Sequence, residues 1–226
     1  MAKTIFPYVE DEIFLKEVSA VFQKMDASRE KIDNDFYDNV VDPFSALFDS
    51  AGRDIIFEEW KQEEEGRQLQ KTLQNEIGYF HQRILGSIGD WIDPGLNAGY
   101  DSENKKHKIF AEIKNKWNTF NSNSEAETYD KMSGLLDGDK KGYTGYVVFI
   151  IPKTPVRFKK KFIPSKRSER ENLFLVDGAT YYELVTGDKD ALIKLFHALP
   201  IAIHKLRKVK PDTKKFIDLF YKAYGK

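Results

Sequence analysis

The run GYTGYVVFII at residues 142–151 constrains the fold of this chain more than any other feature. Its β-branched and aromatic residues favour a strand, and it is apolar at consecutive positions rather than at alternate ones. Pro152 ends the run, because proline cannot donate a hydrogen bond to a neighbouring strand. The run therefore predicts a central strand that is buried on both faces of a sheet.

Other segments supply the remaining elements of such a sheet. Residues 98–103 and 107–114 have strand patterns joined by a three-residue turn, and residues 173–176 predict another strand. A capping-box pattern, Ser124-Glu-Ala-Glu127, predicts a helix that continues to about Leu136. Apolar spacing predicts helices at residues 10–25, in the second half of 54–86 and at 180–185, 188–197 and 212–223, with 33–49 helical or mixed and broken near Pro43. This order predicts an α/β (α+β) fold in which helices flank a small mixed sheet.

Composition excludes several classes of protein. The 226 residues fit one domain, or one domain with an appended subdomain, and they include no cysteine. Disulfide scaffolds, cysteine zinc sites, iron–sulfur clusters and thiol nucleophiles are thereby excluded. No apolar run approaches the length of a membrane span, and the first residues turn acidic without a signal-peptide core. We therefore expect a cytoplasmic protein.

The charges are divided unevenly although the net charge is zero. Residues 1–76 carry 9 basic and 18 acidic side chains, whereas residues 151–226 carry 18 and 8. This asymmetry predicts that the C-terminal third meets a polyanion while the N-terminal part faces solvent. Ordinary segregation of charge between solvated helix faces is an equal alternative on composition alone.

The most informative residues are Asp101, Glu112 and Lys114. If the two strands pair antiparallel about a turn centred between Lys106 and His107, Asp101 lies directly opposite Glu112. Lys114, two residues further on, points to the same face. Two neighbouring carboxylates repel each other unless a cation lies between them, and few oxygen ligands with retained water suit Mg²⁺. Such a site can support metal-assisted hydrolysis of a phosphodiester, with the lysine orienting the water or stabilising charge.

The pattern Asp101…Glu112-Ile113-Lys114 resembles the PD-(D/E)XK signature of nucleases. Tyr100 stands where that signature has proline, a position that is commonly degenerate. The resemblance implies that Asp101 and Glu112 hold Mg²⁺, that the Ile113 carbonyl adds a ligand and that Lys114 positions the attacking water. A glutamate from the preceding helix often completes the metal shell in such nucleases, and Glu76 is the best match.

Further segments resemble one family of type II restriction endonucleases that cut GGNCC-like interrupted palindromes. These segments are AEIKNKWNT at 111–119, FIIPK at 149–153, KFIPS at 161–165 and LVDGATYYELVTG at 175–187. The resemblance implies a Mg²⁺-dependent, homodimeric, sequence-specific endonuclease of double-stranded DNA, with a cognate DNA methyltransferase as genetic partner. It places a PD-(D/E)XK core at residues 61–226. The preceding helical region, 1–60, is then a candidate for the dimer interface.

Polar and basic residues after the catalytic strand are the candidate DNA contacts, since amides and cations hold phosphates or read base edges. They are Asn115, Lys116, Asn118, Thr119, Arg157, Lys159, Lys160, Lys161, Lys166 and Arg167. Alternatively, the amides only form turns, and the basic run is a flexible loop in solvent. Trp117 is expected to pack rather than to stack on a base.

Other residues near the signature have plainer interpretations. Glu103 falls nearer the hairpin tip than Asp101, and we expect it to be solvated. His81 is expected to be a boundary residue rather than a general base, and Glu76 has an ordinary helix-surface role as its alternative. For Asp101, Glu112 and Lys114 the alternative is a network of ion pairs on an exposed surface.

Two alternative functions remain open at this stage. One is a structure-specific or repair nuclease of the same fold. The other is a DNA-binding protein without catalysis, or a structural protein in which the acidic residues are incidental.

Overall fold

The computed structural model describes residues 4–95 and 97–225, which form two compact units. Residues 19–77 make up a helical unit, and the remaining described residues, before and after it, make up a core unit that contains the sheet. The functional division expected at residue 60 stays a prediction. None of the described helices is long and apolar enough to cross a membrane.

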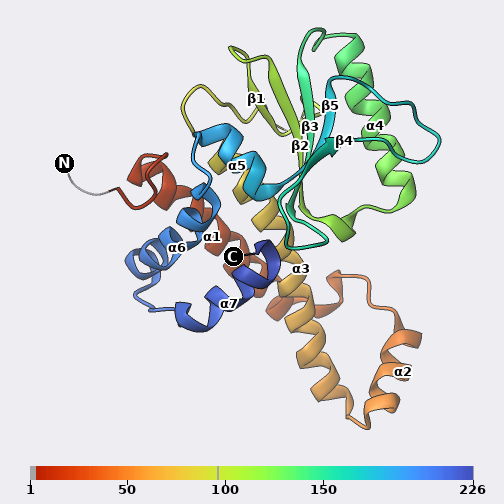
Figure 1. Cartoon of the computed structure of the whole chain (residues 1–226). Coiled ribbons are helices and arrows are strands. Elements are labelled where there is room, and N and C mark those ends of the chain that lie inside the picture. Colours follow the sequence, from red (N-terminus) through yellow and green to blue (C-terminus); the bar gives the residue numbers. More distant parts are fainter. Residues whose placement is uncertain (1–3, 96, 226) are drawn as a thin grey trace. The chain divides into compact units, whose positions relative to one another are not determined.

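The core unit is built on a five-stranded mixed sheet in the order β1-β2-β3-β5-β4 (Figure 1). The strands are β1 Ser102–Asn104, β2 Ile109–Lys116, β3 Thr144–Ile151, β4 Lys159–Lys161 and β5 Leu173–Asp177. β2, β3 and β5 are parallel, whereas β1 and β4 pair antiparallel at the two ends. β3 is central and buried at six of its eight positions, which confirms the prediction made from its apolar run.

Helices cover both faces of this sheet (Figure 1). α4, Ser122–Asp137, packs Tyr129, Met132 and Leu136 into one core cluster with Phe110 and Val147 of the sheet. On the opposite face α5, Gly178–Thr186, brings the ring of Tyr181 to 6.0 Å from that of Tyr146 on β3. A Cβ on Gly178 would lie 2.5 Å from the Ile150 carbonyl oxygen, so only glycine allows α5 to start this close to β3.

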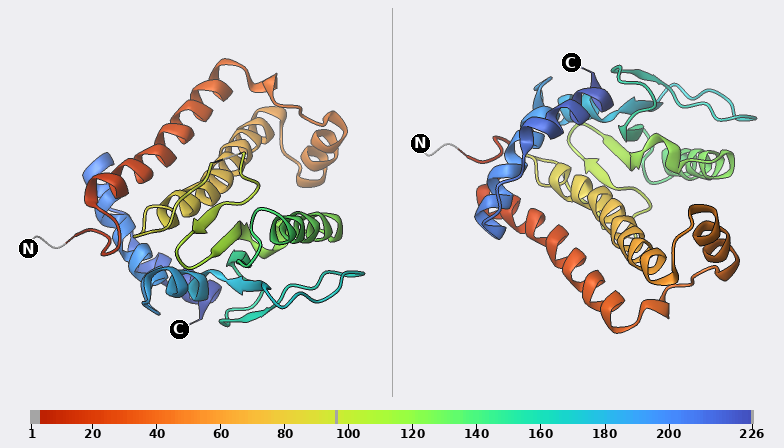
Figure 2. Two further views of the ribbon diagram at one scale, coloured as in Figure 1. Left: turned by 90° about the horizontal axis from the view of Figure 1, so that it is seen from above. Right: turned by 90° about the horizontal axis from the view of Figure 1, so that it is seen from below.

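The last helices, α6 Ala191–Arg207 and α7 Thr213–Tyr224, follow α5 in the core unit. Figure 2 shows them side by side, and the rings of Phe196 and Phe220 join them at 5.0 Å. α6 is longer than predicted because it continues past Pro200. Its apolar face maintains the helix through this proline, which a sequence pattern treats as a breaker.

The helical unit consists of the later part of α1 Asp11–Asn34, η1 Phe36–Asp38, α2 Pro43–Arg53 and the first part of α3 Phe57–Leu85. Its small core is formed by Ile32, Phe36 and Trp60. As expected from the sequence, the helical pattern is interrupted near Pro43: η1 ends at Asp38, and Pro43 begins α2. It lies in the first turn, where its missing N–H costs nothing, and the Asp42 carboxylate accepts a hydrogen bond from Phe44 N at 3.0 Å.

Two further boundaries differ from the sequence predictions. The capping box of α4 is made by Asn121 and Ser124, so the helix begins earlier than Ser124. Strand β4 lies inside the basic connection, where no strand was predicted. Three consecutive lysines lack an apolar alternation, and their pairing with β5 comes from the tertiary fold.

Candidate active site

The β1–β2 hairpin brings the predicted carboxylates together. Ser102 pairs with Ala111, and Asp101 N donates to the Ala111 carbonyl at 2.8 Å. This register places Asp101 across from Glu112, as the turn midpoint predicted. Asp101 lies just before β1, where the hairpin opens.

Asp101 is held in place by the neighbouring strand. Its Oδ2 accepts a hydrogen bond from Ile113 N at 2.7 Å. Burial, together with the charge of Glu112, raises the pKa of Asp101 from 3.8 to about 6, although the Ile113 N–H, Lys114 and Lys131 act in the opposite direction. Burial is thus the main reason that Asp101 resists ionisation.

Glu112 is 5% exposed and accepts hydrogen bonds from two ammonium groups. Lys114 Nζ lies 2.7 Å from Oε1, and Lys131 Nζ lies 2.7 Å from Oε2. The alternative of an exposed surface ion network is therefore wrong for Glu112. The two charged hydrogen bonds compensate for removing the Glu112 carboxylate from water, which an exposed ion pair does not need.

Lys131, which the sequence did not single out, contacts the predicted site through Glu112. It lies on α4, next to the buried positions Thr128 and Met132 of that helix. Only the packing of α4 on the face of β2 that carries Glu112 brings the two residues together. The one sequence signal is that Lys131 and Glu127 are four residues apart on the predicted helix, which is too common to identify a site.

The two lysines open onto a hollow of about 350 Å³. Its lining combines strand, turn and helix residues: Glu112, Lys114, Thr119, Phe120, Ser124, Glu127, Thr128 and Lys131. Lys114 Nζ also lies 5.8 Å from the centre of the Phe120 ring. The Glu112 carboxylate and the two ammonium groups thus meet at a hollow in the surface.

A neighbouring hollow of about 680 Å³ shares Phe120 with the first and also contains Trp117. Trp117 is 39% exposed, and Lys153 Nζ lies 5.2 Å above its ring. The ring thus has a contact within the protein and a partly exposed face, and the expectation that Trp117 packs rather than stacks on a base stays a prediction. The short η2 helix, Trp117–Thr119, turns this ring outward after the strand ends.

Glu103 was expected to be solvated, and this is also wrong. It is 1% exposed and accepts hydrogen bonds from Lys140 Nζ at 2.6 Å and from the Tyr100 hydroxyl at 2.8 Å. Burial opposes ionisation, but these two donors outweigh it and hold the pKa of Glu103 below its ordinary value. The Glu103 carboxylate therefore stabilises the hairpin through buried hydrogen bonds.

His81 is a buried residue of α3 whose Nδ1 lies 2.8 Å from the Tyr182 hydroxyl. Burial lowers its pKa to about 4, so the imidazole is neutral near pH 7. It belongs to the interior rather than to a boundary.

The predicted DNA contacts fall into two groups. Asn115 and Lys116 lie at the end of β2, and Asn118 and Thr119 in η2 are exposed, close to the carboxylates in the chain. Several residues of the basic connection instead have partners within the protein. Arg157 donates to the Ala179 carbonyl at 2.9 Å, and Arg167 forms a bidentate ion pair with Asp130.

The lysines of that connection differ among themselves. Lys159 Nζ donates to the Tyr146 hydroxyl at 2.9 Å, and Lys161 Nζ donates to the Glu171 carbonyl at 2.7 Å. Lys160 lies near the Phe158 ring and, like Lys166, is exposed. As DNA contacts, all of these residues stay predictions.

The donor set fits a divalent cation held by oxygen atoms. Within the part of the chain that the structure describes, no cluster of three or more His, Cys, Asp and Glu forms a metal site by itself. The two carboxylates nevertheless lie across one strand pair, where a cation between them would offset their negative charges. Ile113, 3% exposed, lies between Glu112 and Lys114 in the chain.

The mixed sheet with helices on both faces, and a hairpin carrying Asp101, Glu112 and Lys114, are those of a restriction-endonuclease-like nuclease core. The chain belongs to the Eco47II restriction endonuclease family, which it matches over residues 6–208. It is similar to the type II restriction enzyme Eco47II of Escherichia coli, with 37% identity over 98% of this chain and 100% of the relative. It is also similar to the type II restriction enzyme Sau96I of Staphylococcus aureus, with 26% identity over 99% of this chain and 90% of the relative. The protein is accordingly a type II site-specific deoxyribonuclease, with DNA as its substrate.

Proposed function

We propose that this protein hydrolyses both strands of double-stranded DNA at a short palindromic site with Mg²⁺ as cofactor. The observation that carries the proposal is the opposition of Asp101 and Glu112 across the β1–β2 hairpin, with Lys114 bonded to Glu112. The site would be an interrupted palindrome of the GGNCC type that the sequence resemblance implies. A cognate methyltransferase as genetic partner and a cytoplasmic location complete the proposal.

Asp101, Glu112 and the Ile113 carbonyl would hold the metal, which when bound supplies a Lewis acid for the phosphoryl oxygen and lowers the pKa of a water. Lys114 would then orient the attacking water and stabilise charge that develops on the phosphate. Hydrolysis breaks one P–O bond of the backbone and adds the water to phosphorus. Glu76 is proposed as a further ligand. It is 8% exposed on α3.

Lys131 would act as a positioning residue. Its hydrogen bond to Oε2 of Glu112 leaves Oε1 to Lys114, so each ammonium fixes one oxygen of the carboxylate. Without Lys131 the Glu112 side chain could rotate and draw Lys114 away from the substrate. A catalytic group that is out of position lowers the rate of the reaction more than it lowers the affinity for the substrate.

The proposed homodimer is supported by an apolar face on the helical unit. None of the residues of α2 is buried, and Phe44, Leu47 and Phe48 are 75%, 70% and 78% exposed. Exposed aromatic side chains gathered on one helix are typical of a protein interface. A twofold dimer places one active site on each strand of a palindrome.

The proposed reaction is tested by incubating unmethylated plasmid with the purified protein in Mg²⁺ or in EDTA. We expect discrete fragments only with Mg²⁺, and sequencing their ends identifies the site and the cut position. Asp101→Asn and Lys114→Ala should lower the cleavage rate by ~10²–10⁴-fold while DNA binding survives. Lys131→Gln should lower it at least ~10-fold, with recovery in Lys131→Arg, which keeps the donor.

Lys106→Ala is the matched control, because Lys106 lies at the tip of the same hairpin and is paired with Asp90 at 3.5 Å. Normal turnover in both Asp101→Asn and Lys114→Ala would show that the site lies elsewhere. Cleavage confined to branched substrates would indicate a repair nuclease. Binding without metal-dependent cleavage would indicate a DNA-binding protein.

A further inference from the structure

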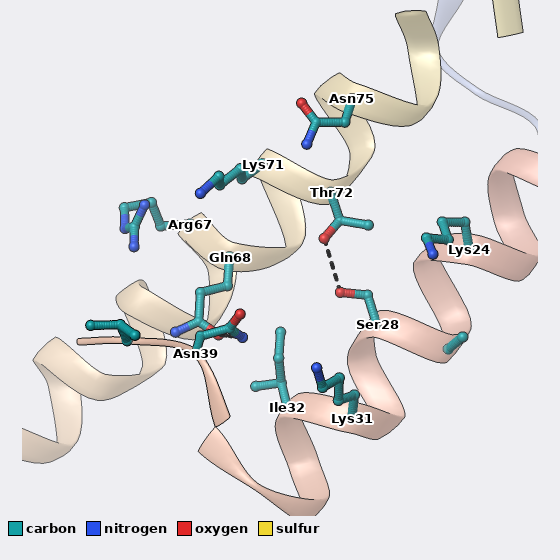
Figure 3. Close-up of a pocket in the computed structure, with 12 residues that line it drawn as sticks. Lys24, Ser28, Lys31, Ile32, Asn39, Arg67, Gln68, Lys71, Thr72 and Asn75 are labelled. Carbon is teal, nitrogen blue, oxygen red and sulfur yellow. Dashed lines mark hydrogen bonds between the residues drawn. The ribbon is translucent and has the colours of Figure 1, made fainter. Parts of the chain in front are cut away.

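A cationic groove crosses the helical unit, apart from the residues of the proposed reaction. It is a hollow of about 510 Å³ between α1 and α3 (Figure 3). Lys24 and Lys31 reach it from α1, and Arg67 and Lys71 from α3. Hydroxyl and amide groups fill the space between these cations.

The charge of this groove is opposite to that of the unit around it. Residues 19–77 carry seven Lys and Arg against fourteen Asp and Glu. Four of the seven basic residues line the groove, whereas its described lining contains no carboxylate. Random placement in so acidic a unit would bring carboxylates into the lining, so the separation indicates a surface for an anion.

The walls of the groove are held in fixed positions. Ser28 Oγ and Thr72 Oγ1 join the two helices at 3.1 Å (Figure 3). Asn39 Nδ2 donates to Gln68 Oε1 at 2.8 Å, and Gln68 Nε2 donates to Glu64 at 3.1 Å. The amide and hydroxyl donors are therefore preorganised, which lowers the entropy cost of binding.

The cations differ in how far they are neutralised. Arg67 forms a bidentate ion pair with Glu64. For Lys24 and Lys71, both exposed, the described part of the chain supplies no ion-pair partner within 4 Å. Lys24 and Lys31 are two helical turns apart, about 10 Å along α1. A row of this length fits a polyanion better than a single small anion.

We propose that this groove of the helical unit binds the phosphate backbone of DNA. The proposal rests on the proposed function, because it takes duplex DNA as the polyanion. An acidic surface of a second copy fits less well, since the apolar face of α2 is the more suitable contact for a copy of this chain. The acidic N-terminal part then contributes to DNA binding instead of only facing solvent.

The test measures how the affinity for duplex DNA depends on salt. A labelled duplex of about 20 base pairs is titrated with the full-length protein in EDTA between 50 and 200 mM salt, with fluorescence anisotropy as the readout. Each lost phosphate contact reduces the slope of log K against log salt by about 0.9. We expect Lys24→Gln/Lys71→Gln to reduce it by about 1.8 and to weaken specific and non-specific duplexes alike.

Arg53→Gln is the matched control, because Arg53 is an exposed cation of the same unit that is paired with Asp49 and Glu63. It should leave the slope unchanged, and equal unfolding midpoints would show that all the variants are folded. An unchanged slope in Lys24→Gln/Lys71→Gln overturns the proposal. If this double variant keeps the slope but no longer forms a dimer, the proposal is also overturned, and the groove is assigned to a second copy of the chain.

The two proposals fail in distinguishable ways. If the wild-type protein does not cut plasmid in Mg²⁺, the proposed reaction fails while the salt slope still reports on the groove. If the wild-type protein cuts plasmid and the double variant binds DNA with a normal slope, only the groove assignment fails.

Discussion

At the scale of single residues, Asp101 and Glu112 are carboxylates in unequal surroundings. Glu112 accepts hydrogen bonds from two lysine ammonium groups. Asp101 accepts a hydrogen bond from the backbone N–H of Ile113, and this bond lowers its pKa. Burial and the charge of Glu112 nevertheless raise the pKa of Asp101 to about 6. The folded protein binds a proton at this carboxyl at a pH where the unfolded chain has already lost it.

This difference makes stability depend on pH when no metal is present. Between pH 4 and pH 6 the folded state holds more protons than the unfolded state, so stability falls as the pH rises through that window. Asp101→Asn cannot ionise and should raise the free energy of unfolding by up to ~3 kcal/mol at pH 7.5. The gain should vanish near pH 4. Urea titrations of both proteins in EDTA at the two pH values measure it.

Mg²⁺ gives an internal control for the same comparison. A cation that binds only the folded wild-type protein stabilises it by mass action. Added Mg²⁺ should therefore reduce the difference in the free energy of unfolding between wild type and Asp101→Asn. A gap that is equal at both pH values and indifferent to Mg²⁺ would contradict this account of Asp101.

At the scale of elements, the β1–β2 hairpin is braced from its α4 face and from its edge. Glu103 joins the Lys140 ammonium and the Tyr100 hydroxyl, and Lys140 Nζ lies 4.7 Å from the Tyr100 ring. The backbone of Glu103 also pairs with Ile92 in both directions, at 2.9 and 3.0 Å. These contacts fix the strand that begins one residue after Asp101.

We expect Lys140→Met to destabilise the protein by ~2–4 kcal/mol. The Glu103 carboxylate, whose side chain is 2% exposed, would keep its charge in the interior with only the tyrosine donor. Thermal or urea unfolding measures the loss. Glu103→Gln/Lys140→Met, which removes both charges, should be less destabilised than Lys140→Met. The reverse order would show that an unpaired Glu103 charge is not the cause of the loss in Lys140→Met.

At the scale of the whole molecule, the helical unit presents two surfaces of different chemistry. The apolar face of α2 is proposed for a second copy, and the cationic groove between α1 and α3 for DNA. Asn39 and Val40 line both hollows of this unit, so the two surfaces adjoin. An arrangement of this kind would couple dimerisation to contact with the DNA backbone.

Leu47→Glu/Phe48→Glu should convert a dimer into a monomer, because two charges would be buried in an apolar interface. Light scattering after gel filtration measures the mass, and plasmid cleavage should change from linear product to nicked circles or stop. Val209→Glu is the control, since Val209 is 57% exposed in the core unit. A dimer that persists in Leu47→Glu/Phe48→Glu would place the interface elsewhere.

Features that depend on short-range chemistry and on periodicity are predictable from the residues alone. The apolar run before Pro152 predicted a central strand, and the midpoint of one turn predicted that Asp101 faces Glu112. Both follow from local rules, since strand periodicity and hairpin register depend on neighbours in the chain. The same residues carry the resemblance that identified the family.

Which distant segments meet depends instead on how the elements pack. Lys131 reaches Glu112 because α4 packs on that face of β2, and Glu103 is buried because Lys140 closes over it. The lysines of β4 form a strand through pairing with β5, and four cations of the helical unit line one groove because α1 and α3 pack side by side. Charged residues have no periodic signal of their own, so their burial and pairing depend on contacts between elements far apart in sequence.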